Sequence, residues 1–133
     1  MFQKDTQCAI VLVDHGSKHA AANEMLMEVA RMLRDASGID IVEPAHMEIA
    51  EPTVEQAFAA CVARGARHIV VHPFFLAPGR HSTVDIPRMS AEAAAAFPGL
   101  TYRVTPPLGP DPRVIDVVLQ RVLDATPAEL TRR

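Results

Sequence analysis

The sequence predicts an α/β fold: a flavodoxin-like, four-stranded parallel sheet in the order 2-1-3-4, with helices on both faces. Short apolar runs rich in β-branched residues alternate along the chain with longer amphipathic stretches, which is typical of successive βαβ units. Right-handed crossovers then place the helices on both faces of a parallel sheet. A proline stands inside the second apolar run and cannot donate a hydrogen bond to a neighbouring strand, which favours an edge position for that strand.

The first half of the chain predicts two strands joined by a long helix. Residues 8–14 (CAIVLVD) are continuously apolar, which is typical of a strand buried on both faces. Residues 17–37 keep helical spacing, with their methionines at expected core positions, and Gly38 is the expected stop. Residues 41–50 predict the second strand, which lies at an edge because of Pro44.

The second half predicts the remaining elements, and we expect residues 1–133 to form a single domain with a frayed tail over 126–133. In order, they are a helix that begins at the capping box of Thr53 and Gln56 and ends at Gly65, a strand over 68–76, a helix over 82–97 with Ser82 or Thr83 as its N-cap, a strand over 100–108, and a helix over 111–125 that opens with Asp111 and Pro112. The apolar register of the last helix is set by Val114, Val117, Val118 and Val122.

Composition excludes some classes of function. The 133 residues carry a net charge of −3, so the chain lacks the overall basic charge of a typical nucleic-acid-binding protein. Cys8 and Cys61 fall inside predicted core elements and are expected to be buried, reduced thiols. The apolar part of residues 1–14 is too short for a signal sequence or a membrane span, so we expect a soluble cytoplasmic protein without a membrane partner.

Candidate site residues gather where the strands end, because ligands of such sheets bind beyond the carboxyl ends of the strands, between strands 1 and 3. Two neutral imidazoles and a carboxylate suit cobalt, nickel, iron or zinc. Gly16 and Gly79 would let a bulky group approach the backbone, and the expected helix starts after Ser17 and Ser82 would offer N–H groups to anions. The strands deliver Asp14, His15, Gly16, Ser17 and Lys18, then Glu48, Glu51 and Thr53, then Leu76, Ala77, Pro78, Gly79, Arg80, His81, Ser82 and Thr83.

Simpler interpretations remain open for each of these residues. A histidine in such a loop often only forms hydrogen bonds, the carboxylates of an edge strand often face solvent, and Ser17, Ser82 and Thr83 are ordinary N-cap residues. We interpret His46, His68 and His72 as structural and His19 as solvated. The sequence contains no Walker loop, no GxGxxG after a strand, no GxSxG elbow and no CxxC.

Three blocks of sequence, taken in order, resemble the short sirohydrochlorin chelatases, which are class II, ATP-independent chelatases. The blocks are VDHGSK at 13–18, MEIAEPTVEQA at 47–57 and FFLAPGRHSTVDIPR at 74–88. The resemblance runs from about residue 8 to residue 123, and it implies insertion of cobalt, iron or nickel into sirohydrochlorin for cobalamin or sirohaem-type tetrapyrroles. Longer members of that family hold two such domains, so a homodimer of half-size chains is implied, with no cofactor beyond the metal substrate.

The resemblance also implies roles for particular residues. His15 and His81 correspond to the metal-carrying, catalytic histidines. The second block supplies an acid, and we assign Glu48 to the metal or the proton path and Glu51 to a substrate contact. The segment from Leu76 to His81, which includes Ala77, Pro78, Gly79 and Arg80, corresponds to the backbone cradle for the macrocycle. From their charge, Lys18, Arg80 and Arg88 are our candidates to meet its carboxylates, together with the helix N-termini, and Ser17 is a further candidate substrate contact.

Two positions depart from the family pattern, and two other classes of function compete with the chelatase. Asp14 stands where the family commonly has glycine, which would place a carboxylate beside His15 and tune its basicity. His72 stands where an apolar residue is usual. A metal-binding chaperone or sensor would use the same histidines without insertion, and an anion-binding flavodoxin-like domain would need neither histidine.

Overall fold

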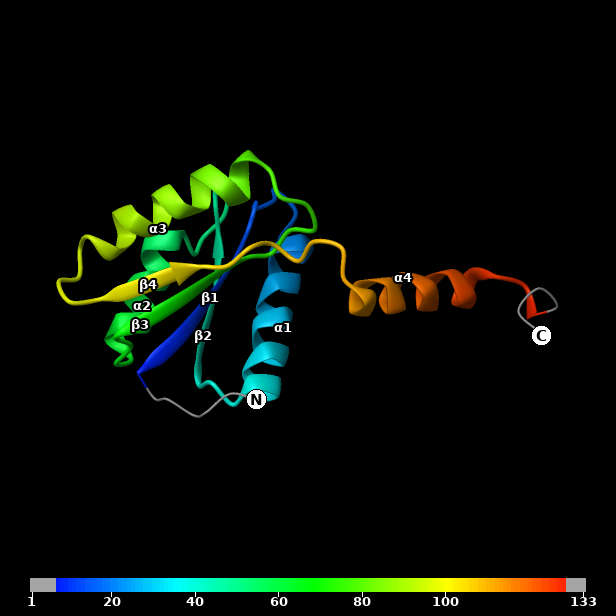
Figure 1. Cartoon of the computed structure of the whole chain (residues 1–133), viewed down its shortest axis with the longest axis horizontal. Helices are drawn as coiled ribbons and strands as arrows, with labels where there is room; N and C mark the ends of the chain where they lie inside the picture. The colour runs from blue at the N-terminus through cyan, green and yellow to red at the C-terminus, as the bar shows by residue number, and fades with distance from the viewer. Residues whose placement is uncertain (1–6, 129–133) are drawn as a thin grey trace.

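The computed structural model describes residues 7–128 and shows four parallel strands alternating with helices (Figure 1). The first part of the N-terminal segment (1–6) and the end of the tail (129–133), whose fraying we expect, lie outside these residues. The elements are β1 (Cys8–Asp14), α1 (Ala20–Ser37), β2 (Ile41–His46), α2 (Val54–Ala63), β3 (His68–Pro73), the π-helical turn η1 (His81–Asp85), α3 (Ile86–Ala94), β4 (Thr101–Val104) and α4 (Pro112–Ala125).

The sheet order is β2-β1-β3-β4, with every pair parallel, which confirms the predicted topology and the edge position of β2. The register brings the C-terminal ends of β1, β2 and β3 to the same height in the sheet. Val13 of β1 lies opposite Ala45 of β2 and Pro73 of β3, and Asp14 lies opposite His46. The loops that follow the three strands therefore leave the sheet at the same height.

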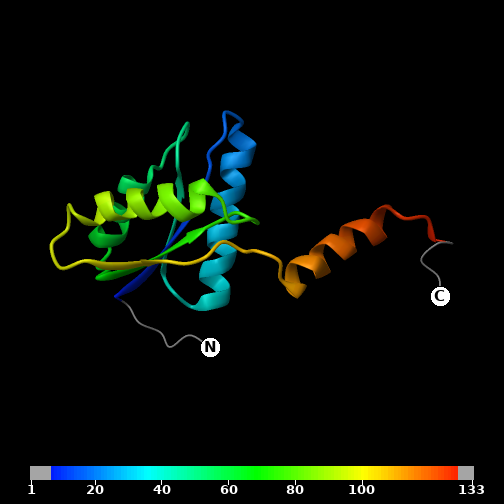
Figure 2. The same ribbon diagram turned by 45° about the horizontal axis from the view of Figure 1, so that its top comes forward.

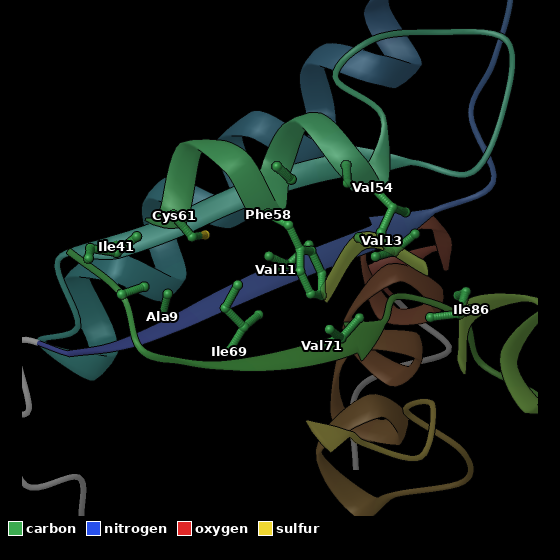
Figure 3. Close-up of a cluster of buried hydrophobic side chains, with 14 residues drawn as sticks. Ala9, Val11, Val13, Ile41, Val54, Phe58, Cys61, Ile69, Val71 and Ile86 are labelled. Carbon is green, nitrogen blue, oxygen red and sulfur yellow. The ribbon is translucent and has the colours of Figure 1, made fainter. Parts of the chain in front are cut away.

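Helices cover the two faces unequally (Figures 1 and 2). On one face α2 and α3 pack over β1 and β3, and Figure 3 shows the buried side chains of this layer, with Phe58 pointing from α2 toward the sheet. On the other face α1 packs on β1 and β2 through Leu26 and Ala30. The Arg34 guanidinium donates a hydrogen bond of 3.0 Å to the carbonyl of Val42, which fixes that side of α1 over β2.

The capping predictions were right at two helices and wrong at two others. The Thr53–Gln56 capping box is formed, and the Asp111 side chain accepts a hydrogen bond from the Arg113 amide. Ser17 is not the cap of α1, because the helix begins later and His19 occupies the cap position without a side-chain bond. Helix formation after β3 already begins at residue 81, so neither Ser82 nor Thr83 precedes its first turn.

The remaining differences concern strand length and the methionines. β2 ends early because Ile49 adopts a left-handed backbone, with φ of 74°, which a straight strand cannot contain. β4 ends before Pro106, which lacks the amide hydrogen that would continue the ladder. The prediction of core methionines in α1 was wrong, since Met25, Met27 and Met32 are each more than half exposed.

The last helix, α4, lies away from the sheet in both views (Figures 1 and 2). None of its residues is buried, and Val117, Val118 and Val122 are about half exposed. The helix predicted over 111–125 is formed, but it does not cover the sheet of its own chain as the two-sided fold implied.

Cysteine burial was predicted correctly for one thiol of two. Cys61 is fully buried in α2, and burial raises the pKa of its thiol to about 12. Cys8 is only half-buried at the start of β1. Over residues 7–128, every helix is too short or too polar to cross a membrane.

Candidate metal-insertion site

The site begins with His15, the first residue after β1. Backbone pairing between β1 and β2 continues past the strand ends: the Met47 amide donates to the Asp14 carbonyl at 2.9 Å, and the Glu48 amide donates to the His15 carbonyl at 3.2 Å. This pairing holds the Glu48 side chain beside the imidazole, with 3.4 Å between His15 Nε2 and Glu48 Oε1. The two residues are brought together by main-chain geometry rather than by chance contact of two flexible side chains.

Gly16 makes this approach possible. Its φ is +96°, a conformation that residues with a Cβ rarely adopt, and a Cβ built there would lie 1.9 Å from the Glu48 carbonyl oxygen. The sequence prediction assigned the missing side chain to ligand approach, but the space is filled by the neighbouring loop. Gly79, in contrast, has nothing within 4 Å of a built Cβ, so that position stays open.

His81 enters the site from the loop after β3. Its ring lies edge to face against that of His15, with centroids 4.7 Å apart and planes at 85°. The Nδ1 atom of His81 lies 3.3 Å from Oδ2 of Asp85, one helical turn later. Because Asp85 engages Nδ1, the Nε2 atom is the nitrogen left to act on a ligand.

The turn that carries His81 is fixed from the preceding glycine. The Gly79 carbonyl accepts hydrogen bonds from the hydroxyls of Ser82, at 3.2 Å, and Thr83, at 2.7 Å. The Gly79 amide donates to the Ser82 hydroxyl oxygen at 3.1 Å. Ser82 is buried, so the two hydroxyls close the loop before the helix instead of capping it.

The histidines and Glu48 form an open surface cluster. The side chains of His15, Glu48 and His81 are 44%, 59% and 54% exposed. Within residues 7–128, no three histidine, cysteine or acidic side chains converge into a ready-made metal-binding group. Because all three side chains are open to solvent, a large ligand could approach this cluster directly.

The Asp14 carboxylate does not contact His15, which corrects the expectation that it would tune that imidazole. Oδ1 of Asp14 lies 2.5 Å from Nδ1 of His46, whose side chain is 1% exposed. This buried pair joins the ends of β1 and β2 directly beneath the loops that carry His15 and Glu48. Its position indicates a role in holding the two loops in register.

The other predicted site residues are spread around the cluster. Glu51 accepts a hydrogen bond of 2.9 Å from Gln56, and among the described residues it has no ion pair with the site histidines. The Ser17 amide and carbonyl are both bonded to the Asn23 side chain, which folds the first loop onto α1. Six further predicted site residues are exposed: Lys18, Leu76, Ala77, Pro78, Gly79 and Arg80.

Arg88 is less favourably placed than the sequence prediction assumed. Its guanidinium pairs with Glu92 at 3.1 Å on the outer side of α3. It lines a pocket of about 250 Å³ with Met47, Thr53 and Met89, between the N-terminal end of α2 and the flank of α3. Arg88 thus belongs to a pocket beside the site rather than to the histidine cluster.

The remaining histidines agree with a structural interpretation. The Nδ1 atoms of His68 and His72 lie 2.7 Å from the hydroxyls of Thr101, in β4, and Thr105, the residue after β4. Burial lowers the pKa of His72. His19 is exposed, and its backbone carbonyl accepts the first amide hydrogens of α1.

Two partners in the site were missed by the sequence analysis. Asp85 was not among the predicted site residues, although its i,i+4 spacing from His81 is a pattern that brings side chains together on a helix. The pairing of Asp14 with His46 had no local signal, because it depends on the register between β1 and β2.

Comparison with known proteins points to one family. A family model described as CbiX matches residues 9–125. Sirohydrochlorin ferrochelatase, chloroplastic, from Arabidopsis thaliana is 50% identical over 113 residues, which cover 85% of this chain and 50% of that protein. Sirohydrochlorin cobaltochelatase from Methanococcus maripaludis is 33% identical over 138 residues, covering 85% of this chain and 96% of that protein.

A solved structure shares the fold. The sirohydrochlorin chelatase SirB from Bacillus subtilis subspecies spizizenii, in complex with cobalt, superposes with a TM-score of 0.84 at 33% identity, over 90% of this chain and 51% of SirB. The chain thus spans about half the length of the Arabidopsis and Bacillus proteins and nearly the whole of the Methanococcus protein. Because the family model covers most of the chain, the protein belongs to the CbiX family of sirohydrochlorin chelatases.

Proposed function

We propose that the protein inserts a divalent metal ion, which is cobalt, iron or nickel, into sirohydrochlorin without ATP or another cofactor. One observation carries the proposal: His15 and His81 meet edge to face at the carboxyl ends of the two central strands, with Glu48 beside His15. The names of the relatives support the substrate and the reaction, since one is a sirohydrochlorin ferrochelatase and another a sirohydrochlorin cobaltochelatase.

His15 and His81 are the proposed ligands of the incoming ion. Two imidazole nitrogens that share one ion lie at most about 4 Å apart, because each bond measures about 2.0–2.1 Å. Ring centroids 4.7 Å apart are therefore within reach of a common ion after small side-chain rotations. Imidazole nitrogens and a carboxylate oxygen bind ferrous iron, cobalt and nickel alike, so these ligands alone do not select one of the three metals.

Proton transfer is the second task of the same residues. Insertion replaces two pyrrole N–H protons with the metal ion, so bases near the ring must accept both protons. His15 and Glu48 lie 3.4 Å apart, and the Glu48 side chain is 59% exposed, which gives an accepted proton a short path to solvent. Asp85 holds His81 by Nδ1 and leaves Nε2 to face the ion or the ring.

The surface around the histidines suits a flat ring with an acidic rim. Leu76 is 59% exposed on the loop before His81, and Ile49 is 59% exposed on the loop that carries Glu48. These apolar side chains are available to the faces of the macrocycle, while Lys18 and Arg80 offer charge to its carboxylates. We retain Glu51 and Ser17 as substrate contacts at the rim, although each is engaged within its own loop.

Assembly and location complete the proposal. We infer that two copies of the chain form a homodimer, because the chain spans only about half of the Arabidopsis and Bacillus proteins. We place this single domain in the cytoplasm, where the buried thiol of Cys61 stays reduced. The product would serve cobalamin or sirohaem-type pathways according to the metal supplied, and nickel is included on ligand chemistry alone.

The test is an anaerobic insertion assay. Purified protein is mixed with sirohydrochlorin and Co²⁺, Fe²⁺ or Ni²⁺ in turn, and the visible spectrum is followed against a control without protein. His15→Ala and His81→Ala are compared with His19→Ala, which removes an exposed imidazole near the site that we assign no role.

We expect faster insertion with the wild type and with His19→Ala, and a rate near the control with the other two variants. Cobalt binding without faster insertion would favour a metal chaperone or sensor. If His15→Ala and His81→Ala bind metal and tetrapyrrole as the wild type does, the result would favour an anion-binding domain.

A further inference from the structure

A strained turn lies in the loop after β2, directly beside Glu48. The Ala50 amide donates a hydrogen bond of 2.8 Å to the Glu48 carbonyl, and Ile49 between them has φ of 74°. A hydrogen bond between residues two apart, around a central residue with positive φ, is typical of the classic γ-turn, which is rare and strained. The strain is severe for a β-branched residue. Within residues 7–128, Ile49 is the one residue other than glycine with a positive φ.

Backbone contacts on both sides of Ile49 hold the turn in this conformation. The amides of Met47 and Glu48 donate to carbonyls at and just after the end of β1, which fixes the loop before Ile49. The His46 amide donates to the Pro52 carbonyl at 2.8 Å and closes the base of the loop. A strained residue persists only where its surroundings over-determine its conformation, and such residues cluster at functional sites.

Packing within the chain does not account for the strain at Ile49. Its side chain is 59% exposed and belongs to neither of the two buried apolar clusters. A glycine would adopt the same turn without a steric conflict at Cβ, and little buried apolar surface would be lost with the side chain. The isoleucine is thus better suited to contact an external ligand than to support the core of its own chain.

The sheet order places exposed apolar side chains on both sides of His15. β2 and β3 are the two neighbours of β1, and adjacent strands lie about 4.8 Å apart, so the loops after β2 and β3 leave the sheet about 10 Å apart, with the His15 loop between them. Ile49 lies on the first of these loops and Leu76 on the second, and each side chain is 59% exposed. A flat ring over His15 therefore has an apolar side chain available on either flank.

The chemistry of Ile49 fits the face of a tetrapyrrole ring. The faces of such a ring are apolar, whereas its carboxylates lie at the rim. Isoleucine is uncharged, and its branched Cβ keeps it stiff at χ1, so holding it against a ligand costs little conformational entropy. Burial of its exposed part against the ring should strengthen binding by about 10-fold.

We propose that Ile49 is a ring-binding residue, whose side chain lies against one face of the tetrapyrrole and holds the ring over His15 and His81 beside Glu48. The γ-turn presents this side chain at the surface, which explains why a β-branched residue occupies a strained position. The inference rests on the proposed function and assigns ring binding to a residue that takes no part in holding the metal.

The first test is binding of sirohydrochlorin without any metal, followed by titration through the visible absorption of the ring. Asparagine tolerates positive φ, so Ile49→Asn suits the turn but replaces the apolar contact with an amide. We expect its Kd to rise about 10-fold, whereas Ile49→Leu stays within about twofold of the wild type. Met27→Asn is the matched control, because Met27 is 58% exposed on α1, outside the site, and its Kd should equal that of the wild type.

Two control measurements on Ile49→Asn exclude a merely structural effect. Its urea midpoint of unfolding should be no lower than that of the wild type, because the side chain is mostly exposed and the turn is less strained. Its affinity for Co²⁺ alone should be unchanged, because the ion is held by the histidines and Glu48. A lower midpoint, or a parallel loss of cobalt affinity, would mean that Ile49 supports the loop rather than the ring, and would overturn the proposal.

The insertion assay then separates ring binding from metal binding. We expect Ile49→Asn to raise the KM for sirohydrochlorin about 10-fold and to leave the KM for Co²⁺ unchanged. Equal Kd values for the ring in the wild type and Ile49→Asn, or no ring binding by the wild type, would overturn the proposal. Because the titration contains no metal, failure of the chelatase function would appear separately, as ring binding that depends on Ile49 without faster insertion.

Discussion

Replacing Gly16 with alanine tests whether the spacing between the His15 and Glu48 loops matters for insertion. The added Cβ would lie 1.9 Å from the Glu48 carbonyl oxygen, where real Cβ atoms keep at least 3.0 Å, so the loops must separate by about 1 Å. A misplacement of this size in a catalytic arrangement typically costs about 100-fold in rate. The positive φ of +96° adds about 1–2 kcal/mol of strain to the folded state.

A matched variant separates strain from displacement. Gly65 has φ of +100° and nothing within 4 Å of a built Cβ, so Gly65→Ala carries the strain without the clash and lies far from the site in the chain. We expect both variants to lose stability in denaturant unfolding, but only Gly16→Ala to lose about 100-fold in the initial rate of cobalt insertion. If Gly16→Ala keeps a rate within about threefold of Gly65→Ala, the reasoning that links the Glu48 position to catalysis is wrong.

Three further predictions concern single side chains. Asp85→Asn should lower the insertion rate about 10-fold by releasing His81, and Asp85→Glu should restore part of it; equal rates in steady-state assays would remove Asp85 from the mechanism. Burial lowers the pKa of His72 below 6.5, so the unfolded chain binds more protons and the free energy of unfolding should fall as pH drops through that value; His72→Gln should show a smaller fall between about pH 7.5 and 5.5 in urea unfolding. The Cys61 thiol, with a pKa of about 12, should resist iodoacetamide at about pH 8 until the protein is unfolded. Rapid labelling of Cys61 in the folded protein, measured by mass spectrometry, would contradict its burial.

The sheet order could be predicted because it depends on patterns that are local in the sequence. Alternating apolar runs fix the type of each element, and Pro44 by itself marks β2 as an edge strand, because a proline leaves one ladder hydrogen bond without a donor. The Thr53 capping box is also local, since its two bonds join residues three apart. The same logic places His15 and His81 together, because parallel neighbouring strands deliver their loops to one edge.

Features that depend on register or on a second surface could not be predicted in the same way. The contact between Asp14 and His46 and the close approach at Gly16 both require the pairing of β1 with β2 to be known residue by residue. The exposure of Met25 and Met32 could not be predicted either, because helical spacing identifies an apolar stripe but not what covers it. In the same way, the helical spacing of α4 does not reveal that none of its residues is buried.

A double-mutant cycle on the two histidines tests the central claim most directly. The rate of cobalt insertion into sirohydrochlorin is measured for the wild type, His15→Ala, His81→Ala and the double variant under the same anaerobic conditions. If both imidazoles hold one ion, removing either one disables the pair, and the double variant should be no more than about threefold slower than the slower single variant. Losses that multiply in the double variant would mean that the two histidines act independently, and would contradict a shared ion between them.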